Sequence, residues 1–428
     1  MKKYIYVLLL AVANLSNAQN PAPAKPQSET ILIMNATAHL GNGQIIQNAV
    51  IGFDKGKLTL VGNATTVRVD KSAYKKVIDG TGKHVYPGFI NCCSTLGLVE
   101  LDAVRSTRDN YETGDLNPNV RSIIAYNTDS KIIPTVRSNG VLLAQIIPQG
   151  GTISGQSSVV QLDAWNWEDA AYKTDEGIHL NWPRMYLYKG EGSQPEDKQR
   201  ENMNKSMNNI DVFFKDAKAY SLSTPVEKNL RFEAMNGLFD GSKKLYVHCG
   251  YIKEIEAAVN FCKKYGIKMV LVDGDDAWMA SDLLKENNVP VILGRVHALP
   301  NRIDDDVDLP YRLPFLLKQA GVTYALSMDG SWGVRNLGFN CGTSAAYGLT
   351  KEEALMSITS APAKILGIDA TTGTLEVGKD ATLFISAGDA LDMRTQDVIA
   401  AYISGKEINL DNMQKQLYVK YKEKYGLK

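Results

Sequence analysis

The stretch Pro87–Leu98 reads PGFINCCSTLGL, and it directly follows GTGKHVY at residues 80–86. An apolar run of this length after a Pro-Gly pair predicts a buried strand. Side chains alternate between the two faces of a strand, so we expect Asn91, Cys93 and Thr95 to share one face. We expect that face to point inwards, which makes these three positions the first candidates for function.

Outward from this strand, the two ends of the chain share one pattern. Short alternating strands begin at Ile31 (ILIMNATAHL, AVIGFD, KLTLVG and VIDGTG), and similar segments return near the other end (TGTLEVGKDATLFISA and VIAAYISGKEI). Between them, apolar strands alternate with helical segments, a pattern typical of a parallel sheet. Such strands are predicted at residues 85–92, 140–148, 244–250, 267–274, 289–294 and 323–330. We therefore expect a long α/β middle and one small β-domain built from both ends.

Three motifs resemble the amidohydrolase superfamily, in the imidazolonepropionase-like, metal-dependent hydrolase branch. GKHVYPGFINCCS is similar to the family's G-K-x-V-x-P-G-F-I-D-x-H-x-H, GTLEVGKDATLFI to its G-x-L-x-x-G-K-D-A-D-L-x-V, and LTKEEALMSITSAPAKILGI to its closing barrel helix. The resemblance spans Ile31 to Ile408. It implies a (β/α)8 barrel plus a small β-sandwich formed by both chain ends. The implied boundaries are 31–85 and 371–409 for the sandwich, 86–370 for the barrel and 410–428 for a C-terminal helix or tail.

Family members hold a divalent metal, commonly zinc, with two histidines on the first strand. In this chain Asn91 stands at the family's aspartate, and Cys93 and Thr95 stand at the two histidines. Cys93 could ligate zinc as a thiolate, whereas threonine is a poor ligand. The alternative is a barrel mouth filled by ordinary side chains. The resemblance therefore implies a degenerate metal site, with zinc bound weakly or not at all.

Some of the family's other metal-ligand positions hold residues that can bind a metal. His248 matches the ligand histidine of strand five, Asp273 stands at the histidine of strand six, and Asp329 matches the catalytic aspartate of strand eight. Together with Cys93, these residues form the candidate metal set, and Asp329 is the candidate catalytic residue. Each also has an ordinary interpretation, because a buried histidine, a carboxylate at a helix start or an aspartate bonded to backbone amides needs no metal. No bridging ligand is identified.

Two functions remain open. The first is a family member with weak, altered or no hydrolase activity, whose barrel binds a small molecule or a partner such as a paralogous amidohydrolase subunit or a second copy. The second is an active metal-dependent hydrolase of non-peptide amide or cyclic amide C–N bonds in a small substrate. Losing three of four histidines favours the first.

The amino terminus predicts export. Residues 1–18 carry a basic start, a short apolar run and a small-residue cleavage site, which is typical of a secretory signal peptide. We expect a mature chain from about Gln19 with a Pro-rich lead to residue 30, located in the periplasm or secreted. The balanced charge of 47 basic and 47 acidic residues disfavours nucleic-acid binding, and no later segment predicts membrane insertion.

The five cysteines match neither a zinc knuckle nor a redox pair, so we expect small buried hydrophobes. Strand alternation predicts that Cys92 and Cys93 face opposite sides, and a disulfide between neighbours would be strained.

Overall fold

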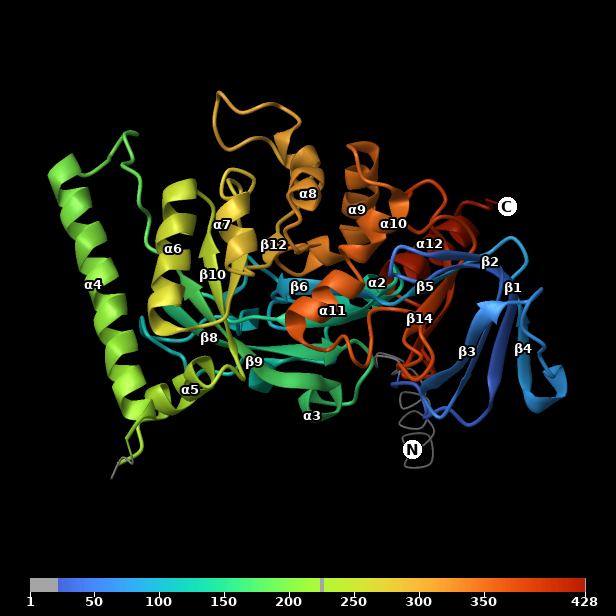
Figure 1. Ribbon diagram of the computed structural model, residues 1–428. Helices are drawn as coiled ribbons and strands as arrows, with labels where there is room; N and C mark the ends of the chain where they lie inside the picture. Colours follow the sequence, from blue (N-terminus) through green and yellow to red (C-terminus); the bar gives the residue numbers. More distant parts are fainter. Residues whose placement is uncertain (1–21, 224–226, 428) are drawn as a thin grey trace, which may run out of the picture.

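A computed structural model describes residues 22–223 and 227–427 (Figure 1). The predicted signal peptide lies outside these residues. The chain forms two eight-stranded sheets, with helices packed around the second, which confirms a mixed α/β fold. No helix in the part of the chain that the structure describes has the length and apolar character needed to cross a membrane.

The first sheet joins both ends of the chain and lies at one end of the molecule (Figure 1). Its order is β16-β15-β14-β5-β1-β2-β3, with β4 paired to β1. The pairing of β5 with β14 is antiparallel and sets Pro87 against Leu383. Its strands are β1 (Ile31–His39), β2 (Ile45–Asp54), β3 (Lys57–Asn63), β4 (Lys76–Asp79), β5 (His84–Pro87), β14 (Leu383–Ser386), β15 (Val398–Ile403) and β16 (Lys406–Glu407). The residues just before β1 are bound as well, since the Gly56 N–H donates to Gln27 Oε1 at 2.8 Å.

The second sheet is the barrel, in the order β6 to β13. Its strands are β6 (Phe89–Ser94), β7 (Val141–Ile146), β8 (Ile153–Gln161), β9 (Ala171–Asn181), β10 (Lys244–Cys249), β11 (Met269–Asp273), β12 (Val291–Leu293) and β13 (Tyr324–Leu326). All neighbours pair in parallel except β8, which is antiparallel to both β7 and β9. A strictly parallel barrel is therefore not what forms. The reason is chain length, because residues 147–152 between β7 and β8 are too few for a parallel crossover.

The first and last barrel strands are closed by side chains. Asn91 of β6 donates from Nδ2 to the Met328 carbonyl at 3.0 Å and accepts at Oδ1 from the Met328 N–H at 2.8 Å. Beside it, Ser327 Oγ donates to the Cys92 carbonyl, and the Thr95 N–H donates to the Gly330 carbonyl at 3.0 Å. These bonds close the barrel where β13 ends.

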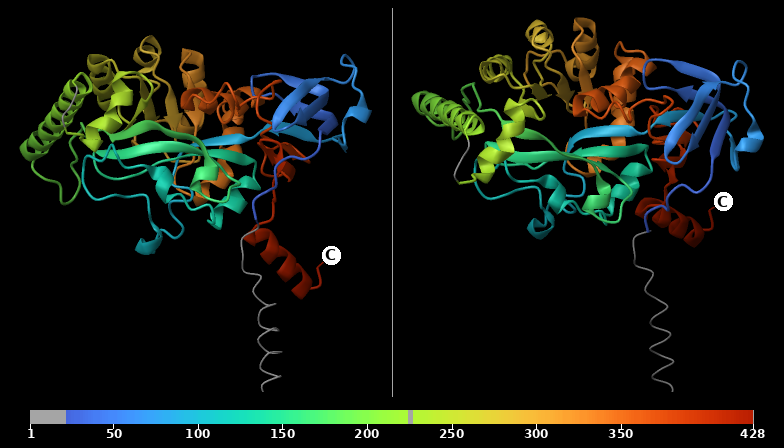
Figure 2. Two further views of the ribbon diagram at one scale, coloured as in Figure 1. Left: turned by 90° about the horizontal axis from the view of Figure 1, so that it is seen from below. Right: turned by 60° about the horizontal axis from the view of Figure 1, so that its bottom comes forward.

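The helices surround the barrel, and the long α4 lies at the end of the molecule away from the first sheet (Figure 1). They are α2 (Ile132–Arg137), α3 (Trp167–Ala170), α4 (Glu196–Ser221), α5 (Leu230–Phe239), α6 (Ile252–Tyr265), α7 (Ser281–Glu286), α8 (Leu309–Ala320), α9 (Leu337–Ala346), α10 (Lys351–Met356), α11 (Ser360–Leu366) and α12 (Met413–Lys424). Helix α12 projects away from the body and buries none of its residues (Figure 2).

Local sequence signals explain two of these helices. Helix α6 ends at Gly266, whose φ of 72° is left-handed and suits a glycine C-cap. Helix α10 begins with a capping box, in which Thr350 and Glu353 bond reciprocally to each other's backbone N–H.

Candidate functional site

The structure brings His248, Asp273 and Asp329 to the same end of the barrel. His248 lies near the end of β10, Asp273 ends β11, and Asp329 follows β13. His248 Nδ1 lies 3.8 Å from Asp273 Oδ2, and the Asp329 charge acts on Asp273. In a barrel, residues at the carboxyl ends of the strands meet around one point, which makes this the mouth where chemistry is expected.

The first strand does not present the face that alternation predicts. Cys93 has a left-handed φ of 47°, and the register of β6 against β7 shifts between Asn91 and Ser94. Cys92 and Cys93 consequently pack in the same apolar cluster inside the barrel, together with Ile90. The prediction that Asn91, Cys93 and Thr95 share one face is wrong, as is the prediction that the two cysteines face opposite sides. The strand bulges just where alternation was assumed.

All five cysteines are free thiols and all are buried, which confirms their interpretation as small hydrophobes. Burial raises the pKa of the Cys93 thiol well above its ordinary value, and the charge of Asp273 acts in the same direction. A protonated thiol is a poor nucleophile. It donates instead to Gln145 Oε1 at 3.4 Å, while the Cys93 N–H donates to the same oxygen at 3.0 Å.

Behind Cys93, a buried polar network centres on Glu176 of β9. Oε1 of Glu176 accepts from Gln145 Nε2 at 2.5 Å and from Ser157 Oγ at 2.6 Å. Oε2 accepts from the Tyr246 hydroxyl at 2.7 Å. Burial raises the pKa of Glu176, and the three donors oppose that shift. Residues of β7, β8, β9 and β10 therefore share one satisfied network within the barrel.

A pair of histidines lies beside this network. His179 Nδ1 and His248 Nε2 are 2.9 Å apart, and the His179 ring stacks on Tyr246 with ring centres 4.8 Å apart. Burial lowers the pKa of His248 to about 4 and lowers that of His179 further below its ordinary value, with His248 adding to the effect. Both rings are therefore neutral at pH 7, and one donates an N–H to the other. His179 Nε2 is buried without a hydrogen-bond partner in the described structure.

Carboxylates dominate the rest of the mouth. Burial raises the pKa of Asp273 to about 6, and the Asp329 charge adds to the rise. Burial raises that of Asp275 to about 6 as well, with contributions from Asp273 and Asp276. The Asp273 side chain is 57% exposed, so solvent screens part of this shift in its pKa. Unlike these two carboxylates, Asp276 has a cationic partner, because Arg302 Nη2 lies 2.8 Å from Asp276 Oδ1.

Asp329 carries no side-chain hydrogen bond within residues 22–223 and 227–427, so the interpretation as a residue bonded to backbone amides has no support. Next to Asp273, a cavity of about 210 Å³ opens over the ends of β11 and β12. Its polar lining includes Asp275, Arg295 and Asn301.

The side chains at this mouth do not fit a metal ion as they are placed. No three His, Cys, Asp or Glu side chains among the described residues are grouped to hold one. One nitrogen of His248 is taken by His179, Cys93 is a neutral thiol bonded to Gln145, and Asn91 is bonded to the Met328 backbone. A zinc site needs three or four nitrogen, sulfur or oxygen ligands free to converge.

The sequence argument missed Gln145, Glu176 and His179. The strands β8 and β9 were not predicted, because ISGQSSVVQ and AYKTDEGIHLN lack the continuous apolar run expected of a parallel strand. One signal was present in the sequence: His179 lies near the end of an alternating segment, GIHLN, as His248 does in YVHCG.

Comparisons with known proteins agree with this architecture. The model of the Amidohydrolase family matches residues 233–408, which begin in α5, after β6–β9. Imidazolonepropionase of Rhizobium rhizogenes is 24% identical over 385 residues, covering 81% of this chain and 88% of that protein.

Solved structures share the fold. The amidohydrolase from Thermotoga maritima MSB8 superposes with a TM-score of 0.77 at 24% identity, covering 89% of this chain and 99% of that one. A. niger ochratoxinase superposes with a TM-score of 0.53 at 13% identity, covering 89% and 96%. The family match over residues 233–408, the similarity to imidazolonepropionase and the shared fold together support placing this chain in the amidohydrolase superfamily.

Proposed function

We propose that this protein is an exported member of the superfamily whose barrel mouth binds a small molecule without metal-dependent hydrolysis. One observation carries the proposal: on the first strand, the possible ligand Cys93 and the neighbouring Asn91 both have side chains that are already bonded within the barrel. Asn91 holds the backbone of Met328, and Cys93 is bonded to Gln145. Releasing them for a metal would leave buried polar groups unpaired, which costs about 1–3 kcal/mol for each group.

The cavity beside Asp273 indicates the chemistry of the ligand. Its volume of about 210 Å³ is small, and it places Asp273 and Asp275 near Arg295. Among the residues that the structure describes, none of these three side chains forms an ion pair, apart from the 3.8 Å approach of His248 to Asp273. An amino group between the two carboxylates would relieve their mutual repulsion, and a carboxylate would pair with the arginine. We expect a small zwitterion.

Metal content is the first test. Protein without a histidine tag is incubated with excess Zn²⁺ or Mn²⁺, desalted at pH 7 and measured by mass spectrometry of the metal. We expect less than about 0.1 metal ion per chain, because the convergent ligand set is missing. Stoichiometric metal that is lost in His248→Ala, together with a lower melting temperature, would overturn the proposal.

That outcome would support the second candidate function, an active metal-dependent hydrolase of amide or cyclic amide C–N bonds in a small substrate. The observation in its favour is the group His248, Asp273 and Asp329, in which Asp329 is unbonded and the pKa of Asp273 is raised. A carboxylate of this kind can serve as a general acid or base. Loss of amidase activity in Asp329→Asn would establish this function.

Ligand chemistry is tested with three molecules of matched size: 4-aminobutyrate, butylamine and butyrate, each at about 10 mM because fragments this small bind weakly. We expect 4-aminobutyrate to raise the melting temperature most, butylamine less, and butyrate least. The variant Asp273→Asn/Asp275→Asn should lose the response to both amines. The matched control Asp282→Asn, an exposed residue of α7, should keep it. Equal responses to all three molecules would rule out recognition of the amino group.

A further inference from the structure

A larger pocket lies at the other end of the barrel. Its volume is about 720 Å³, and its walls include Lys244 and Met269, which begin β10 and β11, and Pro290 and Thr323, which precede β12 and β13. Strands β10 to β13 run parallel, so their starts share one end of the barrel. The mouth with His248 and Asp273 lies at the opposite end. The pocket is therefore separate from the candidate site.

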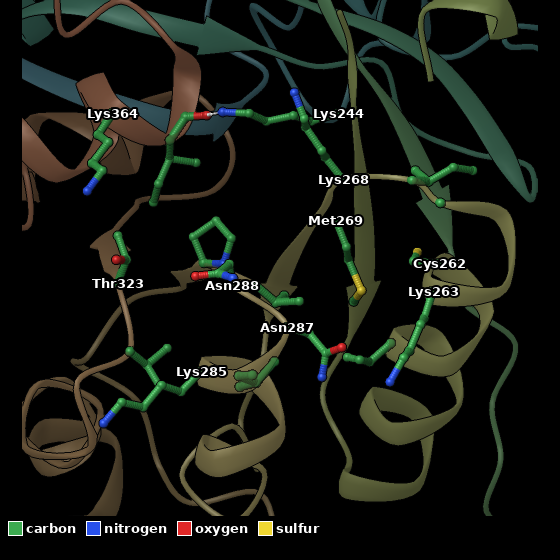
Figure 3. A pocket seen from close by; sticks show the side chains of 18 of the residues that line it. Lys244, Cys262, Lys263, Lys268, Met269, Lys285, Asn287, Asn288, Thr323 and Lys364 are labelled. Carbon is green, nitrogen blue, oxygen red and sulfur yellow. Dashed lines mark hydrogen bonds between the residues drawn. The ribbon is translucent and has the colours of Figure 1, made fainter. Parts of the chain in front are cut away.

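All the charged side chains that line this pocket are positive. Five lysines line it and no aspartate or glutamate does, although the whole chain has equal numbers of basic and acidic residues. Figure 3 shows these lysines arranged around Met269, Asn287, Asn288 and Thr323. They come from separate elements: Lys244 begins β10, Lys263 lies in α6, Lys268 precedes β11, Lys285 lies in α7 and Lys364 lies in α11. Separate segments of chain thus bring like charges to one place.

Three of the five ammonium groups have no partner. Lys244 Nζ donates to the Ile365 carbonyl, and Lys268 Nζ donates to the Gly241 carbonyl at 2.9 Å. By contrast, Lys263, Lys285 and Lys364 form no hydrogen bond or ion pair in the described structure, and all three are exposed. Burial lowers the pKa of Lys244, and the charges of Lys173 and Lys268 add to this effect. Cations gathered around one pocket repel one another, so their clustering calls for a reason.

The partial negative charges at the carboxyl ends of the helices do not account for the five lysines. Helices α6, α7, α8 and α11 all end at this pocket, and their carboxyl termini carry about half a negative charge each, roughly −2 in total. Five ammonium groups therefore leave a surplus of about +3. The terminal carbonyls are also satisfied by backbone, since Ile267 N–H donates to Cys262 at 3.0 Å and Ile368 N–H to Ala363 at 2.9 Å. The lysines are not needed as caps.

We propose that this pocket is a binding site for a small polyphosphate anion, inorganic or carried on a nucleoside. A ligand with two or more phosphate groups carries more negative charge and spans a greater length than a single phosphate, so it can contact ammonium groups from more of these elements at once. Asn287, Asn288 and Thr323 provide neutral donors between the lysines. The apolar floor, which includes Leu284, Val289 and Val322, would contact the base or sugar of a nucleotide. The site does not depend on the function proposed for the mouth.

Calorimetry at 0.15 M salt tests the proposal, with tripolyphosphate and ATP as ligands and with monophosphate, sulfate and citrate as comparisons at equal ionic strength. We expect saturable binding of tripolyphosphate and ATP with one site per chain. Tighter binding of ATP would identify a nucleotide as the ligand, and equal binding would identify the phosphate chain alone. Absence of saturable binding for both, or equally tight binding of citrate, would overturn the proposal.

Charge variants locate the site. The triple variant Lys263→Gln/Lys285→Gln/Lys364→Gln should bind tripolyphosphate at least about 10-fold more weakly, since each ion pair contributes a fraction of a kcal/mol to about 1 kcal/mol. The matched control Lys205→Gln/Lys253→Gln/Lys420→Gln removes three exposed lysines elsewhere and should stay within about twofold. Equal weakening in both would mean that net charge alone drives binding. Because the three substituted pocket lysines have no partners and repel one another, the pocket variant should keep or exceed the wild-type melting temperature, and the control variant should keep it.

Discussion

Replacing Asn91 by aspartate, the residue found at this position in the family pattern, should lower the free energy of unfolding by about 3 kcal/mol at pH 7. The Asn91 side chain is fully buried and donates to the carbonyls of Met328 and Cys92 at 3.0 Å each. An aspartate of the same shape cannot donate, so an ionised carboxylate would face two carbonyl oxygens. Urea unfolding measures the loss. The deficit should shrink below about pH 5, where a protonated aspartate regains one O–H donor.

The matched control is Asn209→Asp on the exposed surface of α4, which should change stability by less than about 0.5 kcal/mol. If Asn91→Asp were as stable as the wild type, or were stabilised by zinc, the role of Asn91 in closing the barrel would be wrong.

Acid should destabilise the protein through its histidine pair. The folded pKa of His248 is about 4 and the ordinary value is 6.5, so the unfolded chain takes up a proton first as the pH falls. This contribution is complete above about pH 6.5 and is lost between there and pH 4, by about 3 kcal/mol. The pKa of His179 is shifted in the same direction. Glu176, Asp273 and Asp275 act the other way, because their raised pKa values stabilise the folded state as the pH falls.

The double variant His179→Gln/His248→Gln isolates the histidine contribution. Relative to the wild type, its free energy of unfolding should rise by at least about 3 kcal/mol between pH 7 and pH 4, because neither side chain can be protonated in either state. His297→Gln is the control. His297 is exposed, lies in the loop after β12 and is bonded through Nε2 to Thr343 of α9 at 2.6 Å. The stability profile of this variant should follow that of the wild type. Parallel profiles for the double variant and the wild type would contradict burial as the cause.

The sequence predicted the architecture well and the site less well. Helix α6 ends at Gly266 and helix α10 begins with a capping box, and such caps can be recognised locally because they depend on a few neighbouring residues. That both ends of the chain join in one β-rich unit was predicted from matching strand patterns. His248, Asp273 and Asp329 do meet at one end of the barrel, since that follows from strand position alone.

The backbone geometry and the buried network of the site could not be predicted from the sequence, and the reason is physical. Cys93 and Asp273 both adopt left-handed φ angles, of 47° and 77°, which sequence does not indicate for residues other than glycine. The network around Glu176 depends on which polar residues of β7, β8, β9 and β10 meet inside the barrel. That is a property of register, and a strand bulge or an antiparallel strand changes it.

The chain is synthesised from its amino terminus, so the pairing of β5 with β14 can form only late in synthesis. β5 follows β1 to β4 along the chain, but its partner β14 begins only at Leu383. Until nearly the whole chain has emerged, the edge of β5 carries unpaired backbone groups, which readily pair with other chains. Pairings so distant along the chain form late and slowly. The first sheet is therefore completed only when the last strands have emerged, and until then its open edge is the part of the sheet most prone to aggregation.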